Sequence, residues 1–237
     1  MRGKGFTFKQ FHIDHSRCAM KVGTDGTLLG AWASLPDEGK ILDIGTGTGL
    51  IAIMAAQRSA KVTISAIDID ADCVSQAQEN VDATNWSNRI NVSHSALQEY
   101  YPNTQFDLII SNPPYFIDSL NSPDAARSTA RHNVTLSFAE LSEGVLRLLK
   151  PDGRFTVILP QPEMQSLQSE LRGKLFATRI CEVWSTPTSG VKRMMAEFEF
   201  TPPSLPIEAE KLIIEDSGPM GYSEEYRRLT RDFYLKF

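Results

Sequence analysis

The chain has few cysteines, and nothing in their spacing ties them together. Cys18, Cys73 and Cys181 lie far apart, and none belongs to a C-x-x-C pair or has histidines at ligand spacing nearby. This pattern argues against a zinc site and against a disulfide framework. We therefore predict buried free thiols and no bound metal.

Long hydrophobic runs are also missing. No stretch of about 18 apolar residues is present, and the basic N-terminus MRGKGFTFKQ is not followed by the apolar block of a signal peptide. With 237 residues, 41% of them hydrophobic and 22% charged, the chain suits one globular domain. We expect a cytoplasmic monomer that does not contact membranes.

The sequence lacks an excess of positive charge as well. A net charge of −5 argues against a protein that binds nucleic acid by electrostatics alone. Basic residues nevertheless gather in three places along the chain, which are Arg2, Lys4, Lys9, Arg17 and Lys21, then Arg127, Arg131 and His132, then Arg227, Arg228 and Arg231. Taken singly, each cluster is better explained as a solvated face, but local clusters leave RNA binding open.

The middle of the chain alternates short apolar runs with helical patterns. Strands are predicted at KILDIG (40–45), KVTISAIDID (61–70), INVSHSAL (90–97), FDLIISN (106–112) and RFTVILP (154–160). Helical patterns follow most of them, and Ser137 and Glu140 have capping-box spacing at the start of one helix. Such alternation predicts an α/β fold with a parallel sheet and helices on both faces.

The two ends of the chain extend this core. After a helix at 163–175, the runs RICEVWS (179–185) and RMMAEFEFT (193–201) predict antiparallel strands, and SEEYRRLTRDFYLKF (223–237) predicts an amphipathic helix. FTFKQFHIDH (6–15) predicts a strand outside the main sheet. We expect a single domain over 1–237, with an extension at 1–35, a core at 36–160 and a C-terminal part at 161–237.

A glycine turn follows the first predicted strand of the core. LDIGTGTGL places Gly45, Gly47 and Gly49 between that strand and its helix, where glycine permits positive φ and close approach of a ligand. The spacing is neither G-x-G-x-x-G nor a P-loop, and the missing lysine argues against a triphosphate. Asp43, just before the turn, would repel a pyrophosphate but suits a ligand with an amino group.

The second predicted strand ends in AIDID. A carboxylate at this tip accepts hydrogen bonds from both hydroxyls of a ribose in dinucleotide-binding folds. Asp68 is the better candidate because it is nearer the strand, and Asp70 is the alternative. Both residues could instead solvate the strand end or cap the next helix.

Taken together, DIGTGTG and Asp68 resemble the first two motifs of class I S-adenosylmethionine-dependent methyltransferases. The resemblance implies a Rossmann-like sheet of seven strands with a reversed last hairpin. It also implies that S-adenosylmethionine binds with its methionine part near Asp43 and the glycine turn, and its ribose on Asp68. Many members carry an acidic residue after the third strand, but this chain has SHSAL. Ser95 stands at that position, so Ser95, the Ala96 backbone or neighbouring apolar groups are expected to contact the cofactor adenine.

The fourth predicted strand leads into NPPY, Asn112 to Tyr115. The lone pair of an exocyclic amine is delocalised, so acceptors aimed at its N–H groups would stabilise the charge that develops on methyl transfer. The Asn112 side chain and the Pro113 carbonyl can supply those acceptors, while the prolines, including Pro114, fix φ. Tyr115 offers a ring for stacking, at about 1–3 kcal/mol per base. Asn112, Pro113 and Tyr115 are thus the predicted catalytic residues.

NPPY resembles the catalytic loop of amino-methyltransferases that act on adenine, cytosine, guanine or glutamine nitrogen. FTFKQFHIDHSRCAMKVGTDGTLLGAWA and YRRLTRDFYL, with SNPPYF, further resemble the bacterial family that methylates adenine N6 next to the anticodon of a valine tRNA. This implies a tRNA partner whose anticodon-loop adenine, 3′ to the anticodon, is extruded into the Asn112–Tyr115 pocket.

The same resemblance assigns further residues. Lys21, Thr24 and Asp25 would close the methionine end of the cofactor site, as part of a lid; alternatively Asp25 caps a helix. Asn112 would also contact the cofactor. Substrate contacts are expected from Pro114, Arg131 and Phe116, although Phe116 could instead pack beneath the pocket.

Three more functions are compatible with these motifs. A glutamine-N5 methyltransferase of a protein substrate would share the loop, but the basic N-terminal segment would then be unexplained. An rRNA guanine-N2 methyltransferase or a DNA adenine-N6 methyltransferase would share it too. The intact Asn112 and glycine turn argue against a non-catalytic binding module.

Overall fold

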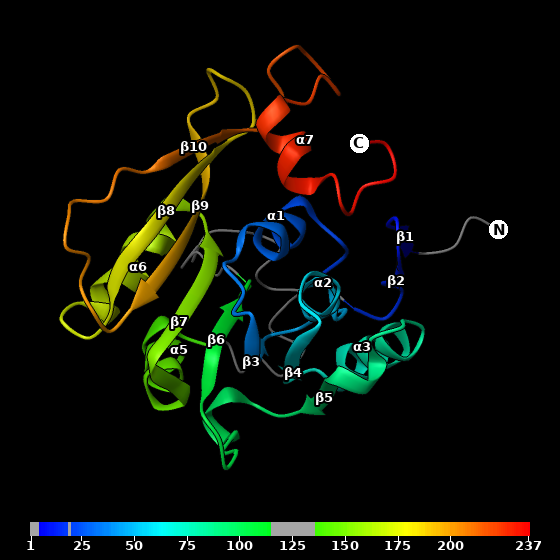
Figure 1. The fold of residues 1–237 in the computed structure, drawn as a ribbon, viewed down its shortest axis with the longest axis vertical. Coiled ribbons are helices and arrows are strands. Elements are labelled where there is room, and N and C mark those ends of the chain that lie inside the picture. Colours follow the sequence, from blue (N-terminus) through cyan, green and yellow to red (C-terminus); the bar gives the residue numbers. More distant parts are fainter. Residues whose placement is uncertain (1–4, 19, 115–135) are drawn as a thin grey trace, which may run out of the picture.

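The computed structural model describes residues 5–18, 20–114 and 136–237. At its centre lies an eight-stranded sheet with the order β10-β8-β9-β7-β6-β3-β4-β5 (Figure 1). The strands are β3 (Glu38–Ile44), β4 (Lys61–Asp68), β5 (Ile90–His94), β6 (Phe106–Ser111), β7 (Leu149–Leu159), β8 (Phe176–Trp184), β9 (Val191–Glu199) and β10 (Glu210–Ile213). All five predicted core strands are present, which confirms the Rossmann-like α/β fold.

One strand reverses the direction of the sheet. β9 runs antiparallel to both of its neighbours, β7 and β8, whereas the other strand pairs in the sheet are parallel. The reversed hairpin agrees with the resemblance, but the resemblance implies seven strands and the sheet has eight. The added strand, β10, pairs in parallel with β8 and gives its otherwise open edge a hydrogen-bonding partner.

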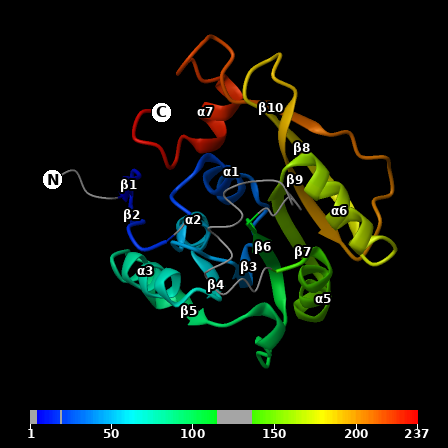
Figure 2. The ribbon, with the colours of Figure 1, turned by 180° about the vertical axis from the view of Figure 1, so that it is seen from behind.

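Helices cover both faces of the sheet (Figures 1 and 2). One face carries α1 (Thr24–Trp32), α2 (Leu50–Arg58), α3 (Ala71–Asp82) and α7 (Glu224–Thr230), and the other carries α5 (Phe138–Leu148) and α6 (Gln161–Leu171). Each face buries its own apolar cluster, one around Leu28 and Ile53 and the other around Leu42 and Phe155. The predicted capping box is formed, since the Ser137 hydroxyl accepts from the Glu140 N–H and Glu140 accepts from the Ser137 N–H.

The N-terminal segment forms a hairpin rather than the single strand that its alternation predicts. β1 (Gly5–Thr7) and β2 (His12–Asp14) make a separate two-stranded sheet, because the chain turns back between Phe8 and Phe11. The hairpin lies beside α3, where the Asp14 N–H donates to the Asn80 side chain at 2.9 Å. The sequence could not show this turn, since it contains neither glycine nor proline.

The two ends of the described chain meet each other. The Lys9 backbone N–H donates to the Phe233 carbonyl at 2.8 Å, and the Lys9 ammonium donates to the Phe237 carbonyl at 2.6 Å. The last helix, α7, ends at Thr230, earlier than predicted, and the following aromatic residues pack against the hairpin, with the Phe8 and Tyr234 rings stacked at 5.9 Å. Phe6, Phe8 and the C-terminal aromatic residues thus form one cluster.

All three cysteines are buried free thiols, as predicted. No helix within 5–18, 20–114 or 136–237 is long and apolar enough to cross a membrane.

Candidate functional site

The carboxyl ends of four parallel strands bring the predicted site residues to one edge of the sheet. Ile44 pairs with Ile67 on one side and with Ser111 on the other, and Asp68 pairs with His94. The residues that follow these positions therefore lie side by side, which is where open α/β sheets bind their ligands. Asp43, the glycine turn, Asp68, Ser95 and Asn112 all belong to this edge.

The glycine turn leaves open space above its backbone. Gly45 and Gly47 have φ of 70° and 56°, in the left-handed region, and a Cβ at either position would meet nothing within 4 Å. The N–H groups of Gly45 and Thr46 both donate to the Ile67 carbonyl, at 2.9 and 3.0 Å, and fix the turn against β4. These glycines are therefore required by backbone conformation, and the space over them can accept a ligand.

Asp43 lies at the end of β3 with one carboxylate oxygen unsatisfied. The residue is 1% exposed, and its Oδ2 accepts from the Thr46 hydroxyl at 2.7 Å. Its Oδ1 is buried and has no hydrogen bond of normal geometry among the described residues, although the Ala52 N–H in the first turn of α2 interacts with the carboxylate. Burial raises the pKa of Asp43 to about 7, and the neighbouring Asp68 carboxylate also raises it. Buried polar groups are rarely left unpaired, so this oxygen fits a ligand with an ammonium group.

The structure separates the roles of Asp68 and Asp70. The Asp70 side chain caps α3 and accepts from the N–H groups of Asp72 and Cys73, at 2.8 and 3.3 Å. Asp68 instead accepts from the Gly47 N–H at 2.8 Å and from the Asp70 N–H at 2.9 Å. Each Asp68 oxygen keeps a further lone pair for a ligand hydroxyl, and burial raises the pKa of this carboxyl. The geometry favours Asp68 over Asp70 as the ribose-binding candidate.

A cavity of about 480 Å³ opens beside Asp68. Its lining residues come from the ends of β4 and β5, from the turn after β5 and from α5, and they are Ile69, His94, Ser95, Ala96, Gln98, Glu99 and Glu140. Sequence reasoning placed Ser95 and Ala96 here but missed Ile69, Gln98 and Glu140. Ile69 follows Asp68 directly and could have been found, whereas Glu140 lies far along the chain.

Asn112 stands at the end of β6, next to the first turn of α1. A Cβ built on Gly26 would lie 3.8 Å from the Asn112 Nδ2, so the helix backbone passes close to this side chain. The Ser111 hydroxyl donates to the Ile44 carbonyl at 2.9 Å and ties the end of β6 to β3. Pro113 is buried and Pro114 is exposed. The three remaining predicted site residues, Tyr115, Phe116 and Arg131, lie outside the described residues.

The segment that enters α1 holds the other predicted cofactor contacts. Lys21 and Thr24 are exposed just before and at the start of the helix. The N-cap is Gly23, without a side-chain capping bond, so the alternative that Asp25 caps this helix is wrong. Asp25 instead accepts from the Arg193 Nε of β9 at 2.7 Å. Sequence reasoning did not find Arg193, because only the fold brings β9 to α1.

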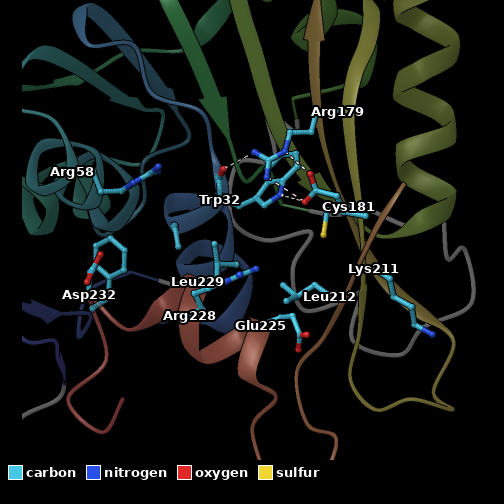
Figure 3. Close-up of a pocket in the computed structure, with 13 residues that line it drawn as sticks. Trp32, Arg58, Arg179, Cys181, Lys211, Leu212, Glu225, Arg228, Leu229 and Asp232 are labelled. Carbon is cyan, nitrogen blue, oxygen red and sulfur yellow. Dashed lines mark hydrogen bonds and ion pairs between the residues drawn. The ribbon is translucent and has the colours of Figure 1, made fainter. Parts of the chain in front are cut away.

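A second cavity, of about 710 Å³, lies between α7, α1 and the strands β8 and β10 (Figure 3). The Arg179 guanidinium stacks on the Trp32 ring at 4.1 Å and donates through Nε to Glu210 at 2.8 Å, and the Trp32 indole donates to the same carboxylate at 3.2 Å. Trp32 and Arg58 are the last residues of α1 and α2, whose first turns lie beside Asn112 and the glycine turn. None of the predicted site residues lines this cavity.

Within the described ranges, no group of three or more His, Cys, Asp or Glu side chains could hold a metal ion. The site at the sheet edge therefore offers two carboxylates, a glycine turn and an amide, and no metal ligand set among the described residues. Such groups can hold a ligand with an ammonium and a ribose next to the amide of Asn112.

Comparison with known proteins agrees with this geometry. The family described as "Methyltransferase small domain" matches residues 18–166. Among solved structures, a protein described as a predicted O-methyltransferase from Agrobacterium tumefaciens superposes with a TM-score of 0.66 at 16% identity, covering 88% of this chain and 96% of that one. TrmN from Thermus thermophilus gives a TM-score of 0.55 at 22% identity, covering 74% and 48%. At these identities the likeness shows the fold alone. Fold, site and family match together define an S-adenosylmethionine-dependent methyltransferase of class I.

Relatives of higher sequence identity show which methyltransferase family the chain belongs to. A protein of Parabacteroides distasonis is 47% identical over 98% of both chains, and one of Trichodesmium erythraeum is 44% identical over 100% of both. Both carry the name tRNA1(Val) (adenine(37)-N6)-methyltransferase. The chain belongs to this family, which confirms the family and the cofactor predicted from the sequence.

Proposed function

We propose that the protein transfers a methyl group from S-adenosylmethionine to N6 of an anticodon-loop adenine, 3′ to the anticodon of a valine tRNA. The observation that carries this proposal is the position of Asn112 at the open sheet edge, beside α1 and in line with Asp43 and the glycine turn. The choice of tRNA adenine is supported by the name of relatives that match over nearly the whole chain.

One set of residues binds the cofactor in this proposal. Asp43 offers its unpaired oxygen to the ammonium of the cofactor, and Asp68 accepts from the ribose hydroxyls. The open backbone of Gly45 and Gly47 leaves room between these carboxylates. When bound, S-adenosylmethionine supplies a methyl group already activated by its sulfonium, so the protein mainly has to position the acceptor amine.

Asn112 and Pro113 are the residues that activate the weakly nucleophilic amine of the substrate. The Asn112 side-chain oxygen and the Pro113 carbonyl accept hydrogen bonds from the adenine N–H groups and stabilise the positive charge that develops on nitrogen. Both residues are fixed by the end of β6, which Ser111 ties to β3. Tyr115 as a stacking ring, and Phe116 and Arg131 as substrate contacts, are part of the same proposal.

Some basic residues are less available for RNA because they bind other groups of the protein. Arg17 forms an ion pair with Glu79 at 2.6 Å, and Lys9 binds C-terminal carbonyls, so these two cations are used within the protein. Lys21, just before α1, and the exposed arginines of the C-terminal segment, Arg227, Arg228 and Arg231, remain as candidates for phosphate contacts. Closure of residues 1–35 over the cofactor, the cytoplasmic location and the monomeric state stay predictions.

The test is incubation of the protein and labelled S-adenosylmethionine with a cell extract of a strain that lacks the gene. The tRNA, rRNA, DNA and protein of the extract are then separated, and the labelled nucleosides and amino acids are identified by mass spectrometry. We expect N6-methyladenine in tRNA. An extract of a strain that keeps the gene is the control, because the adenine in its tRNA is already methylated. Label in protein would favour glutamine-N5 transfer. Label on rRNA guanine would favour guanine-N2 transfer, and label in DNA would favour transfer to DNA adenine N6. Any of these results in place of tRNA adenine would contradict the proposal.

A further inference from the structure

The cofactor adenine carries an exocyclic amine, and the end of β5 holds no carboxylate to accept from it. Ser95 and Ala96 stand where an acid is expected, and the Ser95 hydroxyl donates to the Ala96 carbonyl at 3.0 Å. Ala96 is the N-cap of the short 3₁₀ helix η2 (Leu97–Glu99) and makes no side-chain capping bond. A carboxylate that accepts from the amine would therefore come from another element of the fold.

The cavity beside Asp68 has the volume and the lining residues to accept an adenine ring. Ile69 follows the ribose-binding candidate Asp68 and is 45% exposed, so it presents an apolar surface at the mouth of the cavity. Ser95 and Ala96 line the cavity from the end of β5, and Glu140 lines it from the first turn of α5. Planar bases bind between apolar surfaces, with a few placed polar groups at the ring edge.

Glu140 is held firmly in this position. Its Oε2 accepts from the Ser137 N–H at 2.8 Å and from the Ser137 hydroxyl at 2.7 Å. Hydrogen bonding by the Gln98 side chain, and then by Ser137, lowers the pKa of Glu140, so the group is ionised at neutral pH. A carboxylate has about four lone-pair sites, and these three donors leave room for one more.

We propose that Glu140 accepts a hydrogen bond from the exocyclic amine of the cofactor adenine and replaces the acid missing after β5, with Gln98 holding the carboxylate in place. The proposal rests on the binding of S-adenosylmethionine at this edge. Glu99 lines the same cavity, but its side chain is exposed and has no hydrogen bond or ion pair with any part of the chain that the structure describes. A carboxylate fixed by its neighbours selects a donor better than a mobile one.

Calorimetric titration with two ligands tests the proposal. S-adenosylhomocysteine carries the amine, whereas S-inosylhomocysteine carries a carbonyl oxygen at the same ring position, which a carboxylate repels. We expect the wild-type protein to prefer the adenine ligand. Glu140→Ala should weaken binding of S-adenosylhomocysteine about tenfold to a hundredfold, as for a lost bond to a charged group. The same variant should bind S-inosylhomocysteine at least as tightly as the wild type does, because the repulsion of its carbonyl oxygen is removed. Glu140→Gln should also reduce the preference for S-adenosylhomocysteine over S-inosylhomocysteine, because the glutamine amide can donate to the carbonyl oxygen of the inosine ring.

Two further variants serve as controls. Glu99→Ala removes the same charge from the same cavity and should leave the preference unchanged. Ser137→Ala breaks the capping box without removing the carboxylate, so circular dichroism of this variant measures the effect of the cap on α5 alone. Equal preference in wild type, Glu140→Ala and Glu140→Gln would overturn the proposal, as would a loss of preference in Glu99→Ala only. Failure of the wild type to bind S-adenosylhomocysteine would instead contradict the proposed function itself.

Discussion

Two regions of the molecule, each with a cavity, differ in how their charged groups are satisfied. In the cavity under α7, Arg179 stacks on Trp32 and pairs with Glu210, so its strongest charges neutralise one another. At the carboxyl edge of the sheet, the buried Oδ1 of Asp43 has no hydrogen bond of normal geometry among the described residues. We therefore expect a structural role for the larger cavity, of about 710 Å³, and a ligand-binding role for the smaller cavity, of about 480 Å³, whose lining residues Ile69 and Ser95 lie at this edge. Unsatisfied groups indicate a ligand site better than volume does.

The largest effect is expected at Asn112. Asn112→Ala removes one acceptor for the developing positive charge, so kcat should fall about 100- to 1000-fold, as for other single transition-state contacts. The affinity for S-adenosylhomocysteine, measured by calorimetry, should change little. A kcat within a few fold of wild type would contradict the acceptor role.

The next largest effect is expected at Asp68. Asp68→Ala removes both acceptors for the ribose hydroxyls, so cofactor affinity should weaken about tenfold to a hundredfold. Titration with S-adenosylhomocysteine measures it, and Asp70→Ala is the matched control. Because Asp70 caps α3, its replacement should lower thermal stability rather than affinity. Weaker binding in Asp70→Ala alone would reverse the assignment.

The raised pKa of Asp43 predicts that proton release on cofactor binding depends on pH. Its pKa of about 7 in the folded, cofactor-free protein is raised from 3.8, so this group favours the folded state at low pH and that contribution is lost as pH rises toward 7. An ammonium beside the carboxylate would lower the pKa again, and binding should release about one proton at pH 6 and almost none at pH 8.5. Calorimetry of S-adenosylhomocysteine binding in buffers of different ionisation enthalpy counts these protons. Asp43→Asn should abolish the release, and a release that persists would assign it to another group.

The smallest effect on activity is expected in the cavity under α7. Arg179→Ala breaks a partly exposed ion pair and a cation–π contact, so the free energy of unfolding should fall by about 1 kcal/mol. Denaturant titration measures the change, while kcat and KM for tRNA should stay at wild-type values. A change in KM without a loss of stability would show that this cavity contacts substrate, and the contrast between the two regions would fail.

Local pattern was sufficient for much of the fold. Buried strands such as Phe106–Ser111 and the capping box of Ser137 and Glu140 depend on neighbours in the chain, so their residues predict them directly. The glycine turn is equally local, since positive φ at Gly45 and Gly47 is a property of the backbone itself. Parallel strands then bring Asp43, Asp68 and Asn112 to one edge, because successive strands in such a sheet end on the same side.

Contacts between distant segments could not be derived in this way. The pairing of Asp25 with Arg193 joins residues 168 positions apart, and Lys9 meets Phe237 across 228 positions. The turn within the N-terminal hairpin and the eighth strand likewise depend on partners elsewhere in the fold.

The sequence by itself determined the order of the core strands and helices, the glycine turn and the residues offered at the strand ends, because each depends on neighbouring residues. Only the tertiary structure decided that Glu140 faces the cavity beside Ser95, that the Gly47 N–H donates to Asp68, and that the two chain ends pack together. These outcomes depend on burial and on hydrogen bonds between segments far apart in the chain, and no local pattern encodes such contacts.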